Sequence, residues 1–278
     1  MFKKIRVTIP TFITKVIKTD AEDFGYTPNG FYNEIFSIYA KKKKELEPVQ
    51  KSKNNDIIQF NLNKDNCELY MSILRMYEIQ VESEFWKRVL YNYIDMPKYK
   101  REMIVFQEVI DQIEYAIKKN LKIEVKYKGE LRILEPYFIK YAGGESRNYL
   151  HAYSDKSNGY RNYRLTSIKV LRVLEEKQEH NDKKYIENIK NNFDPFLSYG
   201  CETKVRLTEH GIKHYDTVIT NRPKVKEING DIYTFHCSLE NAKIYFPHFM
   251  DEAEILEPQE LREWFRERFE RITKKYNG

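Results

Sequence analysis

Residues 4–9 alternate strictly between polar and apolar side chains, a period of two that predicts a short strand with one buried face. Between Pro10 and Gly25 the apolar side chains recur at helical spacing, which predicts a helix that stops at the glycine. A second helix is predicted over residues 31–39. The chain therefore begins with a unit of one strand followed by two helices.

The same unit recurs about 53 residues further along the chain. Residues 60–62 match residues 7–9 in pattern, a predicted helix over residues 69–77 matches the first helix, and residues 85–93 match the second helix after one extra residue. One such unit cannot bury the apolar side of its strand alone. Two copies can do so by pairing their strands antiparallel over four helices.

The paired units, over residues 1–96, resemble the ribbon-helix-helix fold of small bacterial DNA-binding proteins, whose two-stranded ribbon enters the major groove. The resemblance implies an outward ribbon face that contacts nucleic acid. Its residues would be Lys4, Arg6, Thr8, Gln59 and Asn61. Arginine binds guanine, and glutamine or asparagine binds adenine, in bidentate fashion, so this set can read bases. The alternative is a scaffold whose polar ribbon only faces water, because one arginine and one lysine form a weak phosphate clamp.

A connecting segment over residues 97–120 follows, with a helix predicted from about Glu102 to Asn120. From Leu121 the period returns to two. Short strands are predicted at residues 123–127, 131–133, 137–141, 149–153 and 163–165. Five short strands within about 45 residues predict a small β-barrel over residues 121–176.

Three stretches of this barrel segment resemble the WYL-domain family, whose members have an Sm-like barrel. They are residues 132–137 (RILEPY), 148–153 (NYLHAY) and 161–168 (RNYRLTSI). Two positions depart from the family pattern, because Asn148 stands where the family has tryptophan and Ser167 where it usually has arginine. The first change removes an aromatic ring and the second a positive charge, so the ligand can differ from that of typical members.

In that family the domain is a regulatory module, often attached to DNA-binding helices, and nucleic-acid-like ligands bind a patch of motif tyrosines and arginines. The resemblance implies a patch here of Arg132, Tyr149, His151, Arg161 and Arg164. Strand alternation places Tyr149 and His151 on one face but puts Arg161 and Arg164 on opposite faces. The alternatives are ordinary barrel packing for the tyrosines and rim salt bridges for the arginines.

Residues 177–200 are polar with few apolar anchors, which predicts a linker. Residues 201–278 then predict two strands, a short helix and a long amphipathic helix over 258–276, similar to the α+β extension that follows many WYL domains. In the family this region commonly mediates dimerisation. The apolar stripe of the last helix is wide for a small domain, which predicts a homodimer, with an intramolecular cap on the barrel as the alternative.

The charge distribution separates these segments further. The whole chain carries +6, but residues 1–56 carry 11 Lys and Arg against 7 Asp and Glu, and residues 121–173 carry 11 against 5. Residues 174–278 carry 17 against 20. Two basic segments alternate with neutral or acidic ones, a pattern typical of anion-binding modules combined with a module for protein contact.

Catalytic and metal-binding constellations are poor. His210 and His214 have the spacing of a metal pair on a helix, but Gly211 occupies the position where a zinc protease has its glutamate. Neither a phosphate loop nor a GxSxG motif occurs, and three widely spaced cysteines argue against a disulfide framework or a structural zinc site. The sequence therefore predicts a binding protein, with no enzyme activity, no metal and no cofactor.

The predicted fold is an α+β multidomain protein: a ribbon-helix-helix-like N-terminal domain, an Sm-like β-barrel WYL domain and a small α+β C-terminal extension. In order and size these parts resemble the WYL accessory proteins encoded beside type VI-D CRISPR ribonucleases, which bind single-stranded RNA and enhance RNA cleavage by the effector. The alternatives are a ligand-responsive transcription factor that reads duplex DNA, and a sensor of a small charged nucleotide. With a mean hydropathy of -0.72 and no transmembrane or signal segment in the pattern, a cytoplasmic protein without membrane contact is expected.

Overall fold

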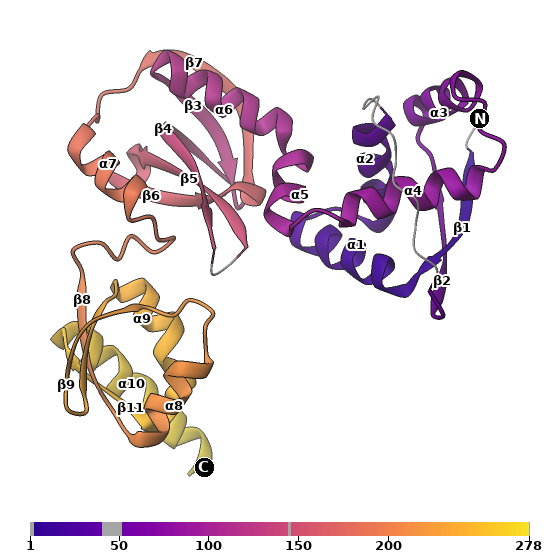
Figure 1. The fold of residues 1–278 in the computed structure, drawn as a ribbon. Coiled ribbons are helices and arrows are strands. Elements are labelled where there is room, and N and C mark those ends of the chain that lie inside the picture. The colour runs from indigo at the N-terminus through magenta and orange to yellow at the C-terminus, as the bar shows by residue number, and fades with distance from the viewer. Residues whose placement is uncertain (1–2, 41–51, 144–145, 278) are drawn as a thin grey trace. The chain divides into compact units, whose positions relative to one another are not determined.

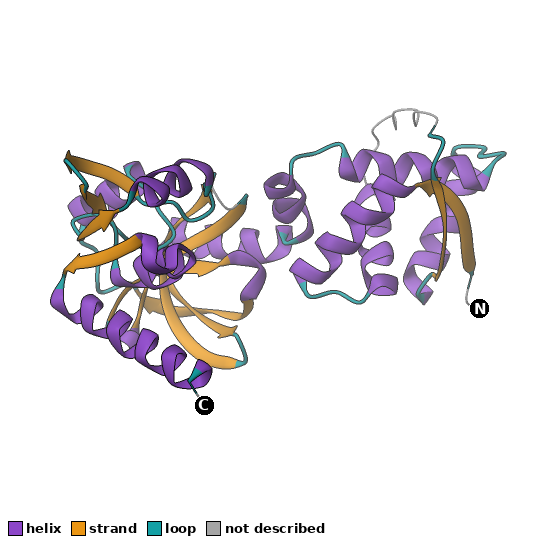
Figure 2. Cartoon of the chain, turned by 90° about the horizontal axis from the view of Figure 1, so that it is seen from below, coloured by secondary structure: helices purple, strands orange, loops and turns teal. Residues whose placement is uncertain are grey.

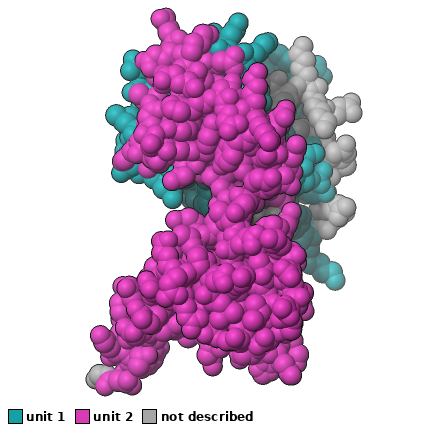
Figure 3. Space-filling view, turned by 90° about the vertical axis from the view of Figure 1, so that its left-hand side faces the viewer, with its two compact units in different colours: residues 1–119, 123–131, 164–173 teal, residues 120–122, 132–163, 174–278 magenta. Residues whose placement is uncertain are grey.

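A computed structural model describes residues 3–40, 52–143 and 146–277 (Figure 1). The chain divides into two compact units, which Figure 3 colours separately. The first unit contains residues 1–119, 123–131 and 164–173, and the second contains residues 120–122, 132–163 and 174–278. The mixture of helices and several sheets confirms the predicted α+β class.

The repeated strand-helix-helix unit is confirmed element by element. Its first copy contains β1 (Lys4–Pro10), α1 (Thr11–Phe24) and α2 (Pro28–Ala40), and its second contains β2 (Asn55–Asn61), α3 (Lys64–Met76) and α4 (Glu82–Ile94). The two strands pair antiparallel, and the helices pack against one side of them (Figure 2). Gly25 ends α1 in the left-handed conformation with φ 75°, which a glycine adopts without steric cost.

The strand register gives the two copies a local twofold relation. Arg6 lies opposite Gln59, and Gln59 is also the residue 53 positions after Arg6, the offset of the repeat. A residue that pairs with its own repeat equivalent lies beside a twofold axis. One chain thus builds an arrangement that would otherwise need two identical chains.

The core of this domain lies under the inner face of the ribbon. Ile5, Val7 and Ile9 of β1 are buried together with Ile58 and Phe60 of β2. Aromatic rings of the helices fill the space beneath them, among them Phe36, Tyr70 and Trp86. Each fully buried side chain of this size contributes about 1.5–3 kcal/mol of hydrophobic stabilisation.

The connecting helix is interrupted, contrary to the prediction of one helix from about Glu102 to Asn120. It consists of α5 (Lys98–Val105) and α6 (Gln107–Lys119), with Phe106 between them. The Phe106 ring packs edge-on against Phe24 at 5.7 Å, which favours packing over a continuous helix at this point. Arg101 of α5 is buried and ion-paired with Asp20 of α1 at 2.6 Å, so α5 belongs to the packed N-terminal domain.

Five strands follow in a sheet of order β6-β5-β4-β3-β7. Their bounds are β3 (Leu121–Tyr127), β4 (Glu130–Ala142), β5 (Arg147–Ser154), β6 (Gly159–Arg164) and β7 (Ile168–Lys177), with short 3-10 turns η1 (Asp155–Ser157) and η2 (Leu165–Ser167). The separate strands predicted at residues 131–133 and 137–141 are one strand, β4. Its pairing with β5 shifts between Pro136 and Phe138, so an irregularity accommodates the proline without ending the strand.

The segment predicted to be a linker, residues 177–200, contains helix α7 (Lys183–Asn191). After it lies a sheet of order β11-β8-β10-β9, formed by β8 (Glu202–Leu207), β9 (Lys224–Asn229), β10 (Ile232–His236) and β11 (Ala253–Glu257). The accompanying helices are α8 (Glu209–Thr217), α9 (Leu239–Tyr245), the 3-10 segment η3 (Phe246–Glu252) and α10 (Gln259–Tyr276).

The apolar stripe of α10 is largely used inside its own domain. Leu261 and Phe265 are buried in the C-terminal core, and Trp264 and Phe269 pack partly against it. The width of this stripe therefore does not by itself indicate a dimer interface, and the homodimer stays a prediction. Within the described ranges, no helix combines the length and the apolar character needed to cross a bilayer.

Candidate nucleic-acid interface

The outward face of the β1–β2 ribbon is exposed and polar. The five side chains predicted to contact nucleic acid all lie on it: Lys4, Arg6, Thr8, Gln59 and Asn61. Lys4 and Arg6 form no ion pair with any residue in the described part of the chain, so both charges are available to an anion. Their role as contacts stays a prediction.

Ile57 is a further outward residue, which the sequence analysis did not include. It lies opposite Thr8 and its side chain is 61% exposed. The alternation with Gln59 was the signal that could have found it, because residues two apart in a strand share a face. An apolar side chain on a polar ribbon can contact a thymine methyl group in the major groove.

Strand β5 carries the second predicted patch. The rings of Tyr149, His151 and Tyr153 lie on one side of the strand, as alternation predicts, and all three are buried. His151 is 0% exposed and lies between two parallel rings, Phe138 at 4.9 Å and Tyr160 at 5.6 Å between centroids. The ring therefore sits inside an aromatic stack.

Hydrogen bonds determine which ring nitrogen of His151 carries the proton. Asn162 Nδ2 donates to the carbonyl oxygens of Asp194 and Pro195, so Asn162 Oδ1 is the atom that faces His151 Nδ1 at 2.8 Å. An amide oxygen only accepts, and so Nδ1 carries the proton. His151 Nε2 has no hydrogen-bond partner among the described residues. Burial holds the pKa of His151 below its usual value, against the smaller opposite effect of the Asn162 hydrogen bond.

Residues 178–198, here called the cover segment, lie over these rings. Tyr185 of α7 packs on Tyr160 at 4.7 Å, and Phe193 packs on Phe138 and Tyr149. His180 stacks on Tyr153 with 3.7 Å between ring centroids. The segment that the composition predicts to be a linker is thus a covering layer of the sheet.

A buried carboxylate holds the start of the cover segment. Glu135 accepts hydrogen bonds from the backbone N–H groups of Glu179 at 3.0 Å and His180 at 2.9 Å, and from the Tyr137 hydroxyl at 2.9 Å. Burial raises the pKa of Glu135, but these hydrogen bonds outweigh it and leave the pKa below the usual value. Lys122 lies 3.6 Å away and supplies the nearby positive charge.

Comparison with known protein families identifies one domain of this chain. The family model of the WYL domain matches residues 108–173, from α6 into β7. The chain contains a WYL domain. This result confirms the resemblance drawn from the three sequence stretches.

Two solved structures extend the comparison. A crystal structure of a CRISPR Cas-related protein superimposes with a TM-score of 0.70 at 18% identity, covering 100% of this chain and 95% of that one, and so the two share a fold. Proteasome accessory factor B/C (PafBC) of Arthrobacter aurescens aligns with a TM-score of 0.30 at 13% identity, over 94% of this chain and 46% of that one. No curated protein matches the chain in sequence.

Within the WYL domain, two predicted ligand residues are not surface rings. Tyr149 is 7% exposed and His151 is fully buried, so neither presents a face to solvent. Both rings are therefore packed in the interior, as in the alternative of ordinary packing, and their role as ligand contacts stays a prediction. The physical reason for this burial is the cover segment, which removes the same face of the sheet from water.

The arginines of the WYL patch lie in different surroundings. Arg161 is exposed, and its guanidinium donates to the Tyr160 carbonyl at 2.8 Å. Arg132 and Arg164 are half-buried. Arg164 belongs to the first compact unit, whereas Arg132 and Arg161 belong to the second with Tyr149 and His151.

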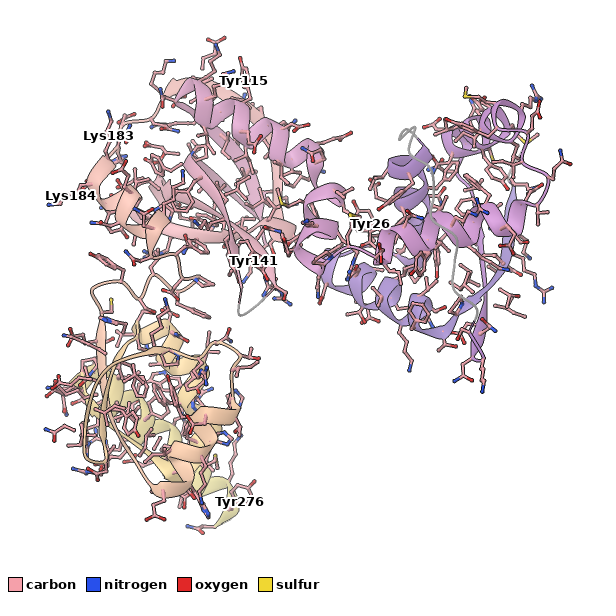
Figure 4. The ribbon with its side chains drawn as sticks, in the orientation of Figure 1. Tyr26, Tyr115, Tyr141, Lys183, Lys184 and Tyr276 are labelled. Carbon is pink, nitrogen blue, oxygen red and sulfur yellow. The ribbon has the colours of Figure 1, made fainter. Side chains whose placement is uncertain are left out.

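The cover segment adds cations that the sequence analysis did not include. Lys183 and Lys184 are exposed at the N-terminal end of α7 (Figure 4). Asp182 caps this helix by accepting from the Tyr185 N–H at 3.0 Å. An N-cap aspartate followed by apolar residues at helical spacing was the available signal for α7.

The two histidines of α8, His210 and His214, lie beside a third histidine and a glutamate. His210, His214 and His248 line a shallow pocket with Glu252. His214 packs edge-on against Phe249 at 4.6 Å, an ordinary core contact. Across residues 3–40, 52–143 and 146–277, no group of three or more His, Cys, Asp or Glu residues has a geometry that could hold a metal ion.

Proposed function

We propose that this protein is a non-catalytic regulator that binds single-stranded RNA and enhances a type VI-D CRISPR RNA-guided ribonuclease. One observation carries the proposal: two exposed cationic surfaces without ion pairs among the described residues, in a chain with a WYL domain. The first surface contains Lys4 and Arg6 of the ribbon. The second contains Arg161, Lys183 and Lys184 beside the WYL strands.

These exposed cations suit the binding of a nucleic-acid strand better than catalysis. Exposed lysine and arginine side chains track the phosphates, and their contribution depends on salt because bound counterions are released. The shared fold with a CRISPR Cas-related protein supports an accessory role beside an RNA-guided effector. In this proposal the buried rings of β5 hold the cover segment in place, while the cations around them contact the ligand.

A second candidate is a ligand-responsive regulator that reads duplex DNA, and the ribbon favours it. The twofold relation at the Arg6–Gln59 pair would present two similar halves to the major groove. Arg6 and Gln59 are also residue types that bind guanine and adenine edges. Under this candidate, the WYL domain would be the sensor.

The deciding experiment compares affinities for single-stranded RNA and duplex DNA at one fixed salt concentration. Tighter binding of RNA supports the accessory role, and tighter binding of a duplex would favour the transcription factor. A Lys183→Ala/Lys184→Ala/Arg161→Ala variant tests the WYL surface, with Lys4→Ala/Arg6→Ala as its matched counterpart on the ribbon. Wild-type RNA affinity in both folded variants would refute the proposed surfaces.

Enhancement of an effector is tested separately. RNA cleavage by a type VI-D ribonuclease should rise when the protein is added, and the protein alone should cleave no RNA. Light scattering of the full chain measures the proposed homodimer. A monomer at all concentrations would remove avidity from the account of RNA affinity.

A further inference from the structure

A cavity of about 330 Å³ lies in the second compact unit, and none of the cations named above lines it. It is formed by residues 142–143 at the end of β4, the end of the cover segment with Tyr199 after it, the loop before β9, the end of β10 and the start of α9. Its size falls in the range of small-molecule sites, roughly 300–1,000 Å³. The predicted nucleic-acid contacts on β1, β2, β5 and β6 do not line it.

An unsatisfied amide points to a ligand in this cavity. Asn241, in the first turn of α9, lines the cavity and is 3% exposed, and its Oδ1 has no hydrogen-bond partner among the described residues. A buried polar atom without a partner costs about 1–3 kcal/mol. A ligand that donates a hydrogen bond at this position would recover that cost.

A second amide lines the same cavity. Asn221 Oδ1 is also buried without a partner in the described part of the chain, and the residue adopts a left-handed φ of 57°. An amide places a donor beside an acceptor, so it can pair with the edge of a nucleobase in either orientation. Two such amides in one cavity favour a planar ligand with several polar edge atoms.

Aromatic and cationic side chains complete the lining. Phe193, Phe196 and Tyr199 supply apolar and aromatic surface, on which a base can stack. Lys224 and His236 are exposed and lie directly opposite each other on β9 and β10. Lys224 forms no ion pair with a described residue, and so its charge is available at the cavity.

The remaining charged groups of the lining are already engaged. The Asp194 carboxylate accepts from the backbone N–H groups of Phe196 and Ser198. Arg222 lies over the Tyr215 ring at 5.3 Å and reaches the carbonyl groups at the end of α8. The lining carries the negative charge of Asp194 against the positive charges of Arg222 and Lys224, so its net charge is positive.

We propose that this cavity binds a nucleotide, with Asn241 and Asn221 contacting the base edge and Lys224 and His236 contacting the phosphate. The ligand can be a free mononucleotide or one nucleotide of a single strand, because both offer the same base and phosphate. The proposal does not depend on RNA binding by the ribbon or by the cations near the WYL strands.

Isothermal titration of the full chain with the common ribonucleoside 5′-monophosphates tests the proposal. A short single-stranded oligoribonucleotide, ribose 5-phosphate and inorganic phosphate serve as the other probes. Equal affinity for a mononucleotide and the oligonucleotide identifies a free nucleotide as the source. Binding of the oligonucleotide alone identifies a strand if Lys224→Ala weakens that binding, whereas oligonucleotide binding that is unchanged in Lys224→Ala comes from the other surfaces and would overturn the proposal. Equal binding of inorganic phosphate and every nucleotide would overturn the proposal, because no base would then be recognised.

Three substitutions localise the binding. Lys224→Ala should weaken nucleotide affinity on the order of tenfold, since a hydrogen bond to a charged group is lost. Its matched control is Lys226→Ala, two residues along the same strand, where the lysine is paired with Glu202 outside the cavity. Asn221→Gly should lower affinity by a similar factor, because glycine keeps the left-handed backbone and removes the amide.

Asn241→Leu separates a ligand contact from a structural role. It removes a buried group without a partner, so the melting temperature of the free protein should stay the same or rise while nucleotide affinity falls at least about tenfold. A lower melting temperature with unchanged affinity would assign Asn241 to folding and count against the site. Wild-type affinity in Lys224→Ala, Asn221→Gly and Asn241→Leu together would overturn the proposal.

Discussion

In both the ribbon and strand β5, alternate side chains share one face. The face that carries the predicted ligand contacts is exposed in the ribbon and buried in β5. Over residues 4–9 of β1 and 57–61 of β2, every second side chain is buried and the residues between are exposed. In β5, all seven residues from Asn148 to Ser154 are buried. Alternation therefore identifies which side chains share a face, and it does not say whether that face meets water.

The difference comes from the layers that each sheet receives. The ribbon has only two strands, with helices on one side, so its other side remains open. Strand β5 lies inside a five-stranded sheet, and the cover segment packs on its ring face. An exposed polar face suits recognition of a partner, whereas a buried aromatic face holds a layer in place.

Tyr149→Ala should give the largest contrast with the ribbon. Loss of a buried aromatic ring leaves a cavity, so the free energy of unfolding should fall by about 3–5 kcal/mol. The control Thr8→Ala, on the open ribbon face, should change it by less than about 0.5 kcal/mol. Calorimetry of both variants measures the difference. A Tyr149→Ala protein as stable as Thr8→Ala would mean that the β5 ring is not a core residue.

Asn162→Ala should have the next largest effect, because one side chain joins His151 to the cover segment. Its loss leaves His151 Nδ1 and two carbonyl groups without their partner, at a cost of about 1–3 kcal/mol. Amide hydrogen exchange over residues 183–198 should accelerate with it. Asn162→Asp keeps an acceptor for His151 but places a carboxylate oxygen against the two carbonyl groups, so it should not restore the protection. Unchanged exchange in Asn162→Ala would separate this hydrogen bond from the packing of the cover segment.

The pH dependence of stability should distinguish the buried histidine from the open ribbon. Since the pKa of His151 is lowered in the folded protein, the unfolded chain binds a proton first as pH falls below about 7. The free energy of unfolding should then fall by up to about 1.4 kcal/mol per pH unit until the folded pKa is reached. His151→Phe should reduce this slope in chemical denaturation.

Glu135 acts in a different pH window. Its pKa is lowered in the folded state, so the stability it contributes is present at neutral pH and is lost only as pH falls below its usual value of 4.5. A slope between pH 7 and 5 that persists in His151→Phe would assign the titration to another group.

Removal of one positive charge from either candidate surface should give the smallest effects, on nucleic-acid affinity alone, and the variants should fold normally. Arg6→Ala and Arg161→Ala should each lower the slope of log affinity against log salt by about 0.7 for single-stranded RNA or about 0.9 for duplex DNA. Melting temperatures should remain near the wild-type value because both side chains are exposed. An altered slope in only one variant identifies which surface contacts nucleic acid. The Thr8→Ala protein serves again as the uncharged control.

The sequence by itself determined the repeat, the antiparallel pairing and outward face of the ribbon, and the resemblance to the WYL domain. The repeat and the ribbon follow from short-range spacing, because alternation, helical periodicity and a glycine such as Gly25 act within a few residues. The WYL domain follows from the resemblance of three sequence stretches to that family. The prediction of a linker over residues 177–200 was wrong because it rested on average composition. The segment is polar on average, but its Tyr185 and Phe193 cover the sheet.

Only the tertiary structure decided which strand faces are exposed to solvent and which buried polar groups lack hydrogen-bond partners. The sequence predicts His151 and Tyr149 as ligand contacts, but their burial depends on Tyr185 and Phe193 of the cover segment, which are distant in sequence and which no local pattern of β5 encodes. Asn221 and Asn241 carried no sequence signal, because an asparagine is unsatisfied only relative to its neighbours in space. Local sequence sets the direction of a side chain, and long-range packing sets what it meets.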